Sequence, residues 1–242
     1  MHALRFNNLT LGYDHQPAIH RLDTEIAAGS LTAVVGPNGA GKSSIYHSII
    51  GLVKPSFGKI IIDGQDATNI PTHTRCSKFG ISWVPQYGGS WSDLNVYDNL
   101  MAIAEIHIKN KEERLLKINN LIRKFELQNV IKLKSKFLSG GQVRKLTLAM
   151  AMVKDTRILI LDEPFAALDP QSVRMIQQII VSLQMFEKIS VSISDHSSRD
   201  LLGCVDTAMV LSNGNIVAKG SPQELINNTQ AIKAYFGEGF KF

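Results

Sequence analysis

The feature that most constrains this chain is a glycine-rich octapeptide near its start. Residues 36–43 read Gly-Pro-Asn-Gly-Ala-Gly-Lys-Ser, which matches the pattern G-x-x-x-x-G-K-[ST]. The apolar run Leu31 to Val35 before it predicts a buried strand, and Ser43 to Ile50 after it predicts a helix that stops at Gly51. This strand–loop–helix context is the one the pattern requires. The octapeptide therefore predicts a loop whose backbone N–H groups surround phosphate oxygens.

The residue types in this loop suit an anionic ligand. Glycine lets the backbone approach phosphate oxygens without Cβ clashes, and the following helix adds the positive end of its dipole. We expect Lys42 to reach the outer phosphates and the hydroxyl of Ser43 to ligate Mg²⁺. By itself the loop predicts only binding of a nucleoside triphosphate. The expected nucleotide contacts here are Gly36, Pro37, Asn38, Gly39, Ala40, Gly41, Lys42, Ser43 and Ser44.

A second motif ends in two acidic residues. The apolar run Ile158 to Leu161 predicts a buried strand, and Asp162 and Glu163 follow at its carboxyl end, where open α/β sheets bind ligands. Asp162 can hold Mg²⁺ through its water shell, and Glu163 can polarise the attacking water. Without the upstream loop, an ordinary strand ending in two acids would be the better interpretation.

Strands and helices alternate along much of the chain, which predicts an α/β fold with a largely parallel sheet. An apolar stripe predicts one helix, and Asn213-Gly214 predicts a hairpin. Residues 87–155 are predicted to be helical and to interrupt the strand-rich scaffold. Further predicted strands are Leu4 to Phe6, Ile19 to Ile26, Ile60 to Asp63, Ile189 to Ile193, Thr207 to Ser212 and Asn215 to Lys219. The residues of the apolar stripe are Val173, Ile176, Ile180 and Leu183.

Composition excludes several classes of protein. With only Cys76 and Cys204, the chain can form neither a disulfide scaffold nor a four-cysteine zinc site, which favours a reduced cytosolic setting. No apolar run approaches the roughly 20 residues of a membrane-spanning helix. Residues 1–8 have no basic segment followed by an apolar stretch, so no signal peptide is expected.

The net charge of +5 comes from one segment. Between Lys109 and Lys136 stand nine Lys or Arg against Glu112, Glu113 and Glu126, so that 9 − 3 gives +6. A basic face of this kind could meet nucleic acid, anionic lipid or an acidic protein. A solvated helical face is the simpler interpretation. The nine are Lys109, Lys111, Arg114, Lys117, Arg123, Lys124, Lys132, Lys134 and Lys136.

The pentapeptide Leu138-Ser139-Gly140-Gly141-Gln142 is the most specific string in the chain. Physics alone would read it as a helix N-cap that also suits a phosphate. Together with the two motifs above, it resembles the signature of the nucleotide-binding subunits of ABC transporters. The family's other elements follow in the same order over essentially the whole chain: Tyr13, residues 36–43, Gln86, residues 138–142, residues 158–163, Ala167-Leu168-Asp169 and His196.

The resemblance implies a fold and a set of roles. The fold is a P-loop (RecA-like) core with an antiparallel β subdomain and an inserted helical subdomain. Residues 1–242 would form one ATP-binding domain, with 1–86 and 156–242 as the core and 87–155 as the helical subdomain that carries the signature. Its implied catalytic residues are Glu163 as general base, with His196, Gln86 and Lys42. Its implied metal ligands are Ser43, Gln86 and Asp162, with ATP and Mg²⁺ as cofactors.

The same resemblance implies how the subunit assembles. Tyr13 would stack on adenine and His196 would hydrogen-bond the γ-phosphate. Ser139, Gly140, Gly141 and Gln142 would contact ATP held by a second copy, in a head-to-tail homodimer. Permease subunits would bind through the Gln86 loop and the groove of the helical subdomain, with Trp91 and Tyr97 as candidate contacts. The simpler alternative is that Trp91 and Tyr97 pack the subdomain. The expected location is cytoplasmic, at the cytoplasmic face of the inner membrane.

Four separate stretches are similar to the lipopolysaccharide-export ATPases: residues 95–102, 162–166, 194–197 and 237–242. The stretch 87–93 and the residues after Gly141 depart from that subfamily. Residues 9–17 and 36–44 look at least as much like zinc and manganese importer ATPases. The transported substrate therefore stays open between lipopolysaccharide export and import of a metal cation or branched-chain amino acid.

A soluble ABC ATPase acting on nucleic acid is the alternative from another class. The chain has neither a second cassette nor a coiled-coil insertion. Its basic segment interleaves only Phe125 and Phe137, too few aromatic residues for a stacking platform. No direct nucleic-acid partner is therefore expected.

Overall fold

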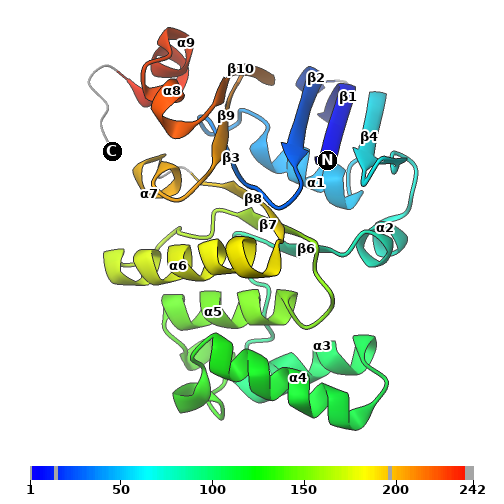
Figure 1. Cartoon of the computed structure of the whole chain (residues 1–242), viewed down its shortest axis with the longest axis vertical. Coiled ribbons are helices and arrows are strands. Elements are labelled where there is room, and N and C mark those ends of the chain that lie inside the picture. Colours follow the sequence, from blue (N-terminus) through cyan, green and yellow to red (C-terminus); the bar gives the residue numbers. More distant parts are fainter. Residues whose placement is uncertain (1, 14–15, 196–197, 238–242) are drawn as a thin grey trace.

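Two sheets organise the computed structural model, which describes residues 2–13, 16–195 and 198–237 (Figure 1). The larger sheet has the strand order β10-β9-β3-β8-β7-β6, and all its pairings are parallel except that of β10 with β9. Since parallel strands end at the same edge, the residues that follow β3, β6, β7 and β8 come together there. Its strands are β3 (Leu31–Val35), β6 (Ile81–Val84), β7 (Ile158–Asp162), β8 (Ser190–Ser194), β9 (Thr207–Ser212) and β10 (Asn215–Gly220).

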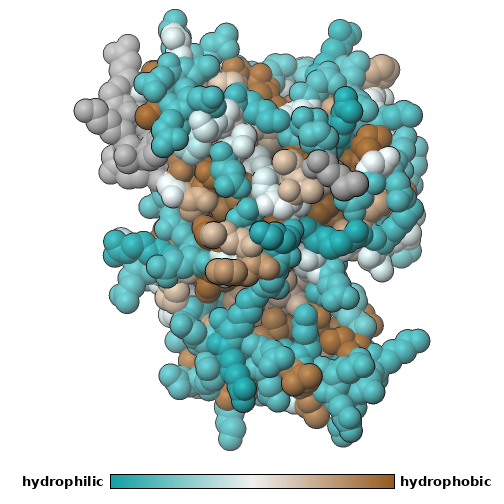
Figure 2. All heavy atoms as spheres, in the orientation of Figure 1, coloured by the Kyte–Doolittle hydropathy of each residue, from teal (hydrophilic) through white to brown (hydrophobic). Residues whose placement is uncertain are grey.

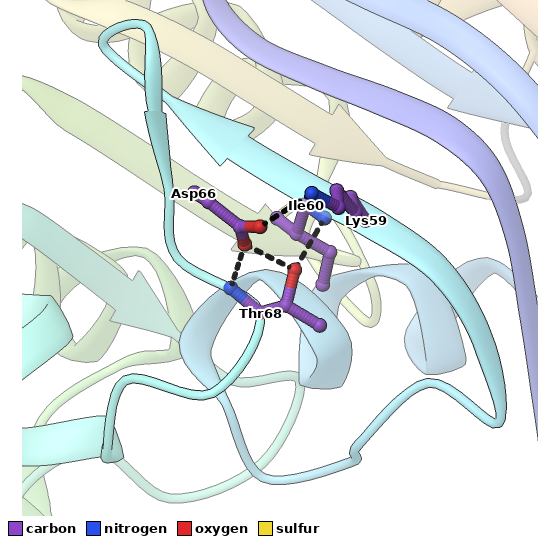
Figure 3. A network of polar contacts seen from close by, with 4 residues as sticks. All are labelled: Lys59, Ile60, Asp66 and Thr68. Atoms are coloured by element: carbon purple, nitrogen blue, oxygen red, sulfur yellow. Dashed lines mark hydrogen bonds and ion pairs between the residues drawn. The ribbon is translucent and has the colours of Figure 1, made fainter.

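The smaller sheet is antiparallel, in the order β2-β1-β4-β5. Asp66 stabilises its last turn by accepting hydrogen bonds from the backbone N–H and the hydroxyl of Thr68, at 3.0 and 2.6 Å (Figure 3). Thr68 Oγ1 accepts the N–H of Ile60 in turn, and Lys59 lies 3.3 Å from Asp66. The strands are β1 (His2–Tyr13), β2 (Gln16–Ala27), β4 (Phe57–Ile62) and β5 (Gln65–Asp66).

Helices cover both faces of the larger sheet. On one face α1 packs between the two sheets, and on the other α6 and α5 lie in layers with α3 and α4 beyond them (Figure 1). Alternate strand residues supply the two cores: Leu159 and Leu161 face α5 and α6, whereas Ile158 and Ile160 face α1. The helices are α1 (Lys42–Ile50), α2 (Thr72–Lys78), α3 (Val96–His107), α4 (Lys111–Lys124), α5 (Gly140–Ala151), α6 (Pro170–Glu187), α7 (Ser198–Leu202), α8 (Pro222–Ile226), α9 (Thr229–Ala231) and the short η1 (Gln128–Val130), η2 (Ser135–Phe137) and η3 (Ile232–Phe236).

The chain between β6 and β7 is helical, but its helices begin later than expected. Residues 87–95 form a loop, and α3 starts only at Val96. The fully buried Asn99 holds this loop, because its amide donates to the carbonyls of Trp91, Leu94 and Asn95 and accepts the N–H of Trp91. These side chain–backbone bonds replace the helical ladder there.

The basic segment lies on the outside of this helical part. All nine of its Lys and Arg side chains are exposed or half-buried, as expected for a solvated face. On the face seen in Figure 2, hydrophilic side chains cover most of the end formed by α3, α4 and α5. Among the described residues, no helix has both the length and the apolar character needed to cross a bilayer.

Candidate functional site

The glycine-rich loop lies between β3 and α1, as the sequence predicts. Two glycines there have no room for a side chain. A Cβ on Gly36 would lie 2.1 Å from the carbonyl oxygen of Leu211, and one on Gly41 would lie 2.6 Å from Ile19 Cδ1. Gly41 also adopts a left-handed conformation, with φ of 104°, as the N-cap of α1. Because glycine brings no capping side chain, the first N–H groups of α1 are available to an anion.

The side chain of Lys42 folds back onto this loop. Its Nζ donates to the carbonyl oxygens of Gly36 and Pro37, at 2.8 and 3.1 Å, and the residue is 7% exposed. Burial lowers the pKa of Lys42, and the negative charges of Glu163, Asp162 and Asp195 oppose that shift. The ammonium is thus a buried cation within electrostatic reach of three carboxylates, and it contacts the loop that would surround phosphates.

The two acidic residues follow β7 at the same edge of the sheet. Asp162 Oδ1 accepts a 2.6 Å hydrogen bond from the hydroxyl of Ser194 on β8. The Glu163 side chain meets the amide of Gln86, whose Nε2 donates to Glu163 Oε2 at 2.5 Å. Gln86 is 77 residues away in sequence, so this contact joins the loop after β6 to the end of β7.

Two further residues at this site escape prediction from the sequence. Arg144 on α5 is buried, and its guanidinium donates to the carbonyl oxygens of Pro85, Gln86 and Glu163, at 3.1, 3.2 and 3.4 Å. Asp195, which follows β8, is fully buried, and its Oδ2 accepts the N–H of Phe165 at 3.0 Å. Asp195 lies in the stretch 194–197 that is similar to the lipopolysaccharide-export ATPases, and this similarity is the sequence signal that could have pointed to it.

The residues proposed to ligate Mg²⁺ offer oxygen donors, which this ion prefers. Ser43 is exposed at the start of α1, Asp162 provides a carboxylate, and Gln86 has an amide oxygen besides the nitrogen that it donates. Within the described part of the chain, no group of three or more His, Cys, Asp or Glu side chains could hold a metal ion by itself. A site that uses one or two carboxylates and completes its shell with phosphates and water fits Mg²⁺.

The signature pentapeptide opens α5 with a capping box. The Ser139 hydroxyl accepts the N–H of Gln142, and the Gln142 side chain accepts the N–H of Ser139. Ser139 and Gly140 are exposed. A Cβ on Gly141 would lie 2.7 Å from the hydroxyl of Ser172, so glycine lets α5 approach the start of α6. The signature therefore presents an exposed helix start.

The remaining predicted site residues are only partly described. Tyr13 ends β1, but its side chain lies outside the described residues, and so does all of His196. Of the two candidate permease contacts, Trp91 is 46% exposed, while Tyr97 is half-buried and packs on the core of α3 to α6. Tyr97 therefore packs on the helical part, and a permease contact by either residue stays a prediction.

Comparisons with known proteins agree on the family. The family model described as ABC transporter matches residues 19–166. The lipopolysaccharide export system ATP-binding protein LptB of Haemophilus influenzae is 34% identical over 242 residues, which cover 100% of both chains. LptB of Escherichia coli K12 is 33% identical over the same length, again with 100% of both chains covered.

Solved structures show the same fold. MJ1267, an ATP-binding cassette of an ABC transporter, superposes with a TM-score of 0.89 at 24% identity, over 98% of this chain and 100% of that one. MJ0796, a bacterial ABC transporter cassette solved as a dimer, superposes with a TM-score of 0.81 at 22% identity, over 90% and 98% of the two chains. The expected P-loop core with an antiparallel sheet and inserted helices is confirmed.

Proposed function

Because this chain belongs to the ABC transporter family and is the ATP-binding, ATP-hydrolysing subunit of a transporter, we propose that this transporter exports lipopolysaccharide. One observation carries this proposal: the match to LptB of Haemophilus influenzae extends over the full length of both chains at 34% identity. The similarity is not confined to the ATP-binding motifs, which all such subunits share. The subunit would then work at the cytoplasmic face of the inner membrane.

The experiment that tests this proposal is co-purification of the tagged, full-length subunit from its native membranes. Capture of two lipopolysaccharide-export permeases is the expected result. Capture of a metal-cation or branched-chain amino-acid importer permease would replace the proposal with the import alternative. Binding to DNA or RNA at near-physiological salt would instead favour the soluble alternative.

The proposed mechanism depends mainly on positioning and charge. The loop N–H groups and Lys42 hold the phosphates, with Ser43, Gln86 and Asp162 as the ligands for Mg²⁺. When bound, Mg²⁺ neutralises the charge that develops on the transferring phosphoryl group. The Glu163 carboxylate accepts a proton from the attacking water, and the 2.5 Å bond from Gln86 orients it. His196 and Tyr13 keep their proposed roles at the γ-phosphate and the adenine.

We propose that residues 87–155 form the helical subdomain and that residues 1–86 and 156–242 form the core. The proposed permease surface is a groove of the helical subdomain beside the Gln86 loop. A cavity of about 290 Å³ lies between β6, α3 and α5, lined by Gly89, Ile103, His107 and Met150 among others. A second cavity of about 640 Å³ adjoins it and shares His107 and Lys154 with it. The second cavity is lined by Lys109, Lys117 and Lys154 together with Glu113 and Asp155, so the groove has a charged rim beside the apolar lining of the first cavity. Such a groove fits an amphipathic helix.

The exposed signature supports the proposed head-to-tail homodimer. The first turn of α5, with Ser139 and Gly140 exposed, is suited to binding an anion. Within this chain, the turn packs through Gly141 against Ser172 at the start of α6. A second copy could present its ATP to this turn. A two-fold arrangement of this kind pairs each loop 36–43 with the partner's signature, so that both ATP molecules lie at the interface.

A further inference from the structure

Asp195 is a buried carboxylate that the mechanism above does not use. It follows β8 directly and is 0% exposed. An ionised carboxylate in such a place is costly unless hydrogen bonds and opposite charges compensate it. Its Oδ2 accepts the backbone N–H of Phe165 at 3.0 Å, two residues beyond Glu163.

The turn that Asp195 holds has an unfavourable backbone. Glu163 has φ of 47° and Ala167 has φ of 59°, in the left-handed region that disfavours residues with a Cβ. Such conformations persist only where the surroundings fix them. Here the N–H of Glu163 donates to the Ser194 carbonyl at 2.8 Å, and Asp195, the next residue, accepts the N–H of Phe165. The end of β8 thus accepts hydrogen bonds from the backbone at Glu163 and from the backbone two residues after it.

Charge ties Asp195 to the same site. Burial lowers the pKa of Lys42 and of Arg144, and the negative charge of Asp195 opposes both shifts. Asp195 therefore lies within electrostatic reach of the phosphate-binding lysine and of the arginine that donates to the Glu163 carbonyl. It is placed to compensate two buried cations and to anchor the turn between them.

We propose that Asp195 is a positioning residue for Glu163, because its hydrogen bond to Phe165 fixes the turn 163–167 and so the direction of the Glu163 carboxylate. The inference rests on the proposed role of Glu163 as general base. Asp195 itself transfers no proton. Its loss leaves ATP binding intact and slows the chemical step, because misplacing a catalytic group by a fraction of an ångström is enough to slow it.

The test compares Asp195→Ala and Asp195→Asn by ATP titration and steady-state ATPase kinetics of the full chain. Asp195→Ala removes the acceptor, and we expect kcat to fall by about 10- to 100-fold. Asp195→Asn keeps an oxygen acceptor but makes a weaker, neutral hydrogen bond, so we expect a smaller fall, about 3- to 10-fold. ATP affinity should stay the same or rise in both, because a negative charge near the phosphates is removed. A merely structural role would not separate kcat from affinity in this way.

Asp206→Asn is the matched control. Asp206 Oδ2 accepts the N–H of Leu31 at 2.8 Å, which is the same kind of bond at the opposite end of β3. Wild-type kcat is expected for this variant. If Asp195→Ala does not fold, Asp195→Asn decides the question, and wild-type turnover by it would overturn the proposal.

Glu163→Gln, measured alongside, separates the two proposals. If Glu163→Gln hydrolyses ATP slowly while both Asp195 variants keep the wild-type kcat, Asp195 has no positioning role and Glu163 remains the general base. If Glu163→Gln hydrolyses ATP at nearly the wild-type rate, Glu163 is not the general base, and the Asp195 proposal fails with it.

Discussion

At the scale of single residues, the proposed hydrolysis depends most on the Glu163 carboxylate. Replacing it by the amide in Glu163→Gln removes the proton acceptor but keeps the size of the side chain. We expect turnover to fall by about 10²–10⁴-fold while ATP still binds, because the loop 36–43 and Lys42 are untouched. ATPase assays with a parallel ATP titration measure both effects. A rate near that of the wild type would take Glu163 out of the general-base role.

Lys42 should make ATP binding sensitive to alkaline pH. Burial lowers its pKa below the ordinary 10.5, and bound phosphates favour the charged form. The proton is therefore retained in the complex at pH values where the free protein loses it. Affinity should be greatest below the depressed pKa and should fall as pH rises through it, by up to about tenfold per pH unit. ATP titrations between about pH 7 and 10 measure this fall.

Lys42→Ala provides the control for this pH dependence. It should bind ATP weakly at every pH and show no such fall. A wild-type affinity that is flat up to the range of an exposed lysine would contradict the role of the buried ammonium.

The residues predicted from local patterns and those missed differ in the range of their contacts. Lys42, Ser43, Asp162 and Glu163 follow from motifs next to one strand each. Arg144 reaches carbonyls up to 59 residues away, and no local pattern encodes that distance. The family resemblance assigned Gln86 and Glu163 to one site, and the hydrogen bond between them is seen only in the structure. The stretch 194–197 marks the region of Asp195, but the contact behind its proposed role, the hydrogen bond from the N–H of Phe165, is seen only in the structure.

At the scale of elements, hydrogen bonds from Arg75 join α2 to α1, the helix that follows the loop 36–43. It is 2% exposed, and its guanidinium donates to the carbonyl oxygens of Ser48 and Ile49 at the end of α1. It also donates to Ile70 and to Thr68, next to the network of Figure 3. The Ser48 carbonyl would keep its bond from the N–H of Gly51, but Arg75→Met removes the donor from the Ile49 carbonyl and four side chain–backbone bonds in total, so we expect a loss of about 3 kcal/mol in unfolding free energy.

Thermal unfolding measures this loss. For a chain of this size the melting temperature should fall by about 6–12 °C. Arg157→Met is the matched control, because Arg157 is 57% exposed and pairs with Asp63 at the surface. Its removal should cost about 0–1 kcal/mol. Equal losses in the two variants would show that burial of the Arg75 bonds does not matter.

The elements that the sequence failed to predict have mixed or short patterns. The strand β6 reads Ile-Ser-Trp-Val, which is too short and too polar to stand out, and α2 spans only Thr72–Lys78. Strands with continuous apolar runs, such as β3 and β7, were confirmed. The helix boundary at residue 87 was wrong because Asn99 holds the preceding loop through side-chain bonds. Tertiary packing decides such cases, not local preference.

At the scale of the whole molecule, the proposed head-to-tail dimer would make each ATP site composite, with the loop 36–43 from one chain and the signature from the other. Lys42→Ala disables the phosphate loop of its own chain, and Ser139→Arg disables the signature that it offers to its partner. Each homodimer then has two defective sites and should be inactive. A mixed dimer has one site with an intact loop from the Ser139→Arg chain and an intact signature from the Lys42→Ala chain.

Mixing the two inactive proteins should therefore restore hydrolysis. If chains exchange freely and each site works alone, half of the dimers are mixed and each has one of two sites intact, so about a quarter of the wild-type rate should return. The rate should follow the product of the two concentrations. If the sites lay within single chains, every chain in the mixture would be defective and no activity could appear, whatever the ratio. Recovery on mixing thus depends on the interface alone, because neither variant changes the other's fold.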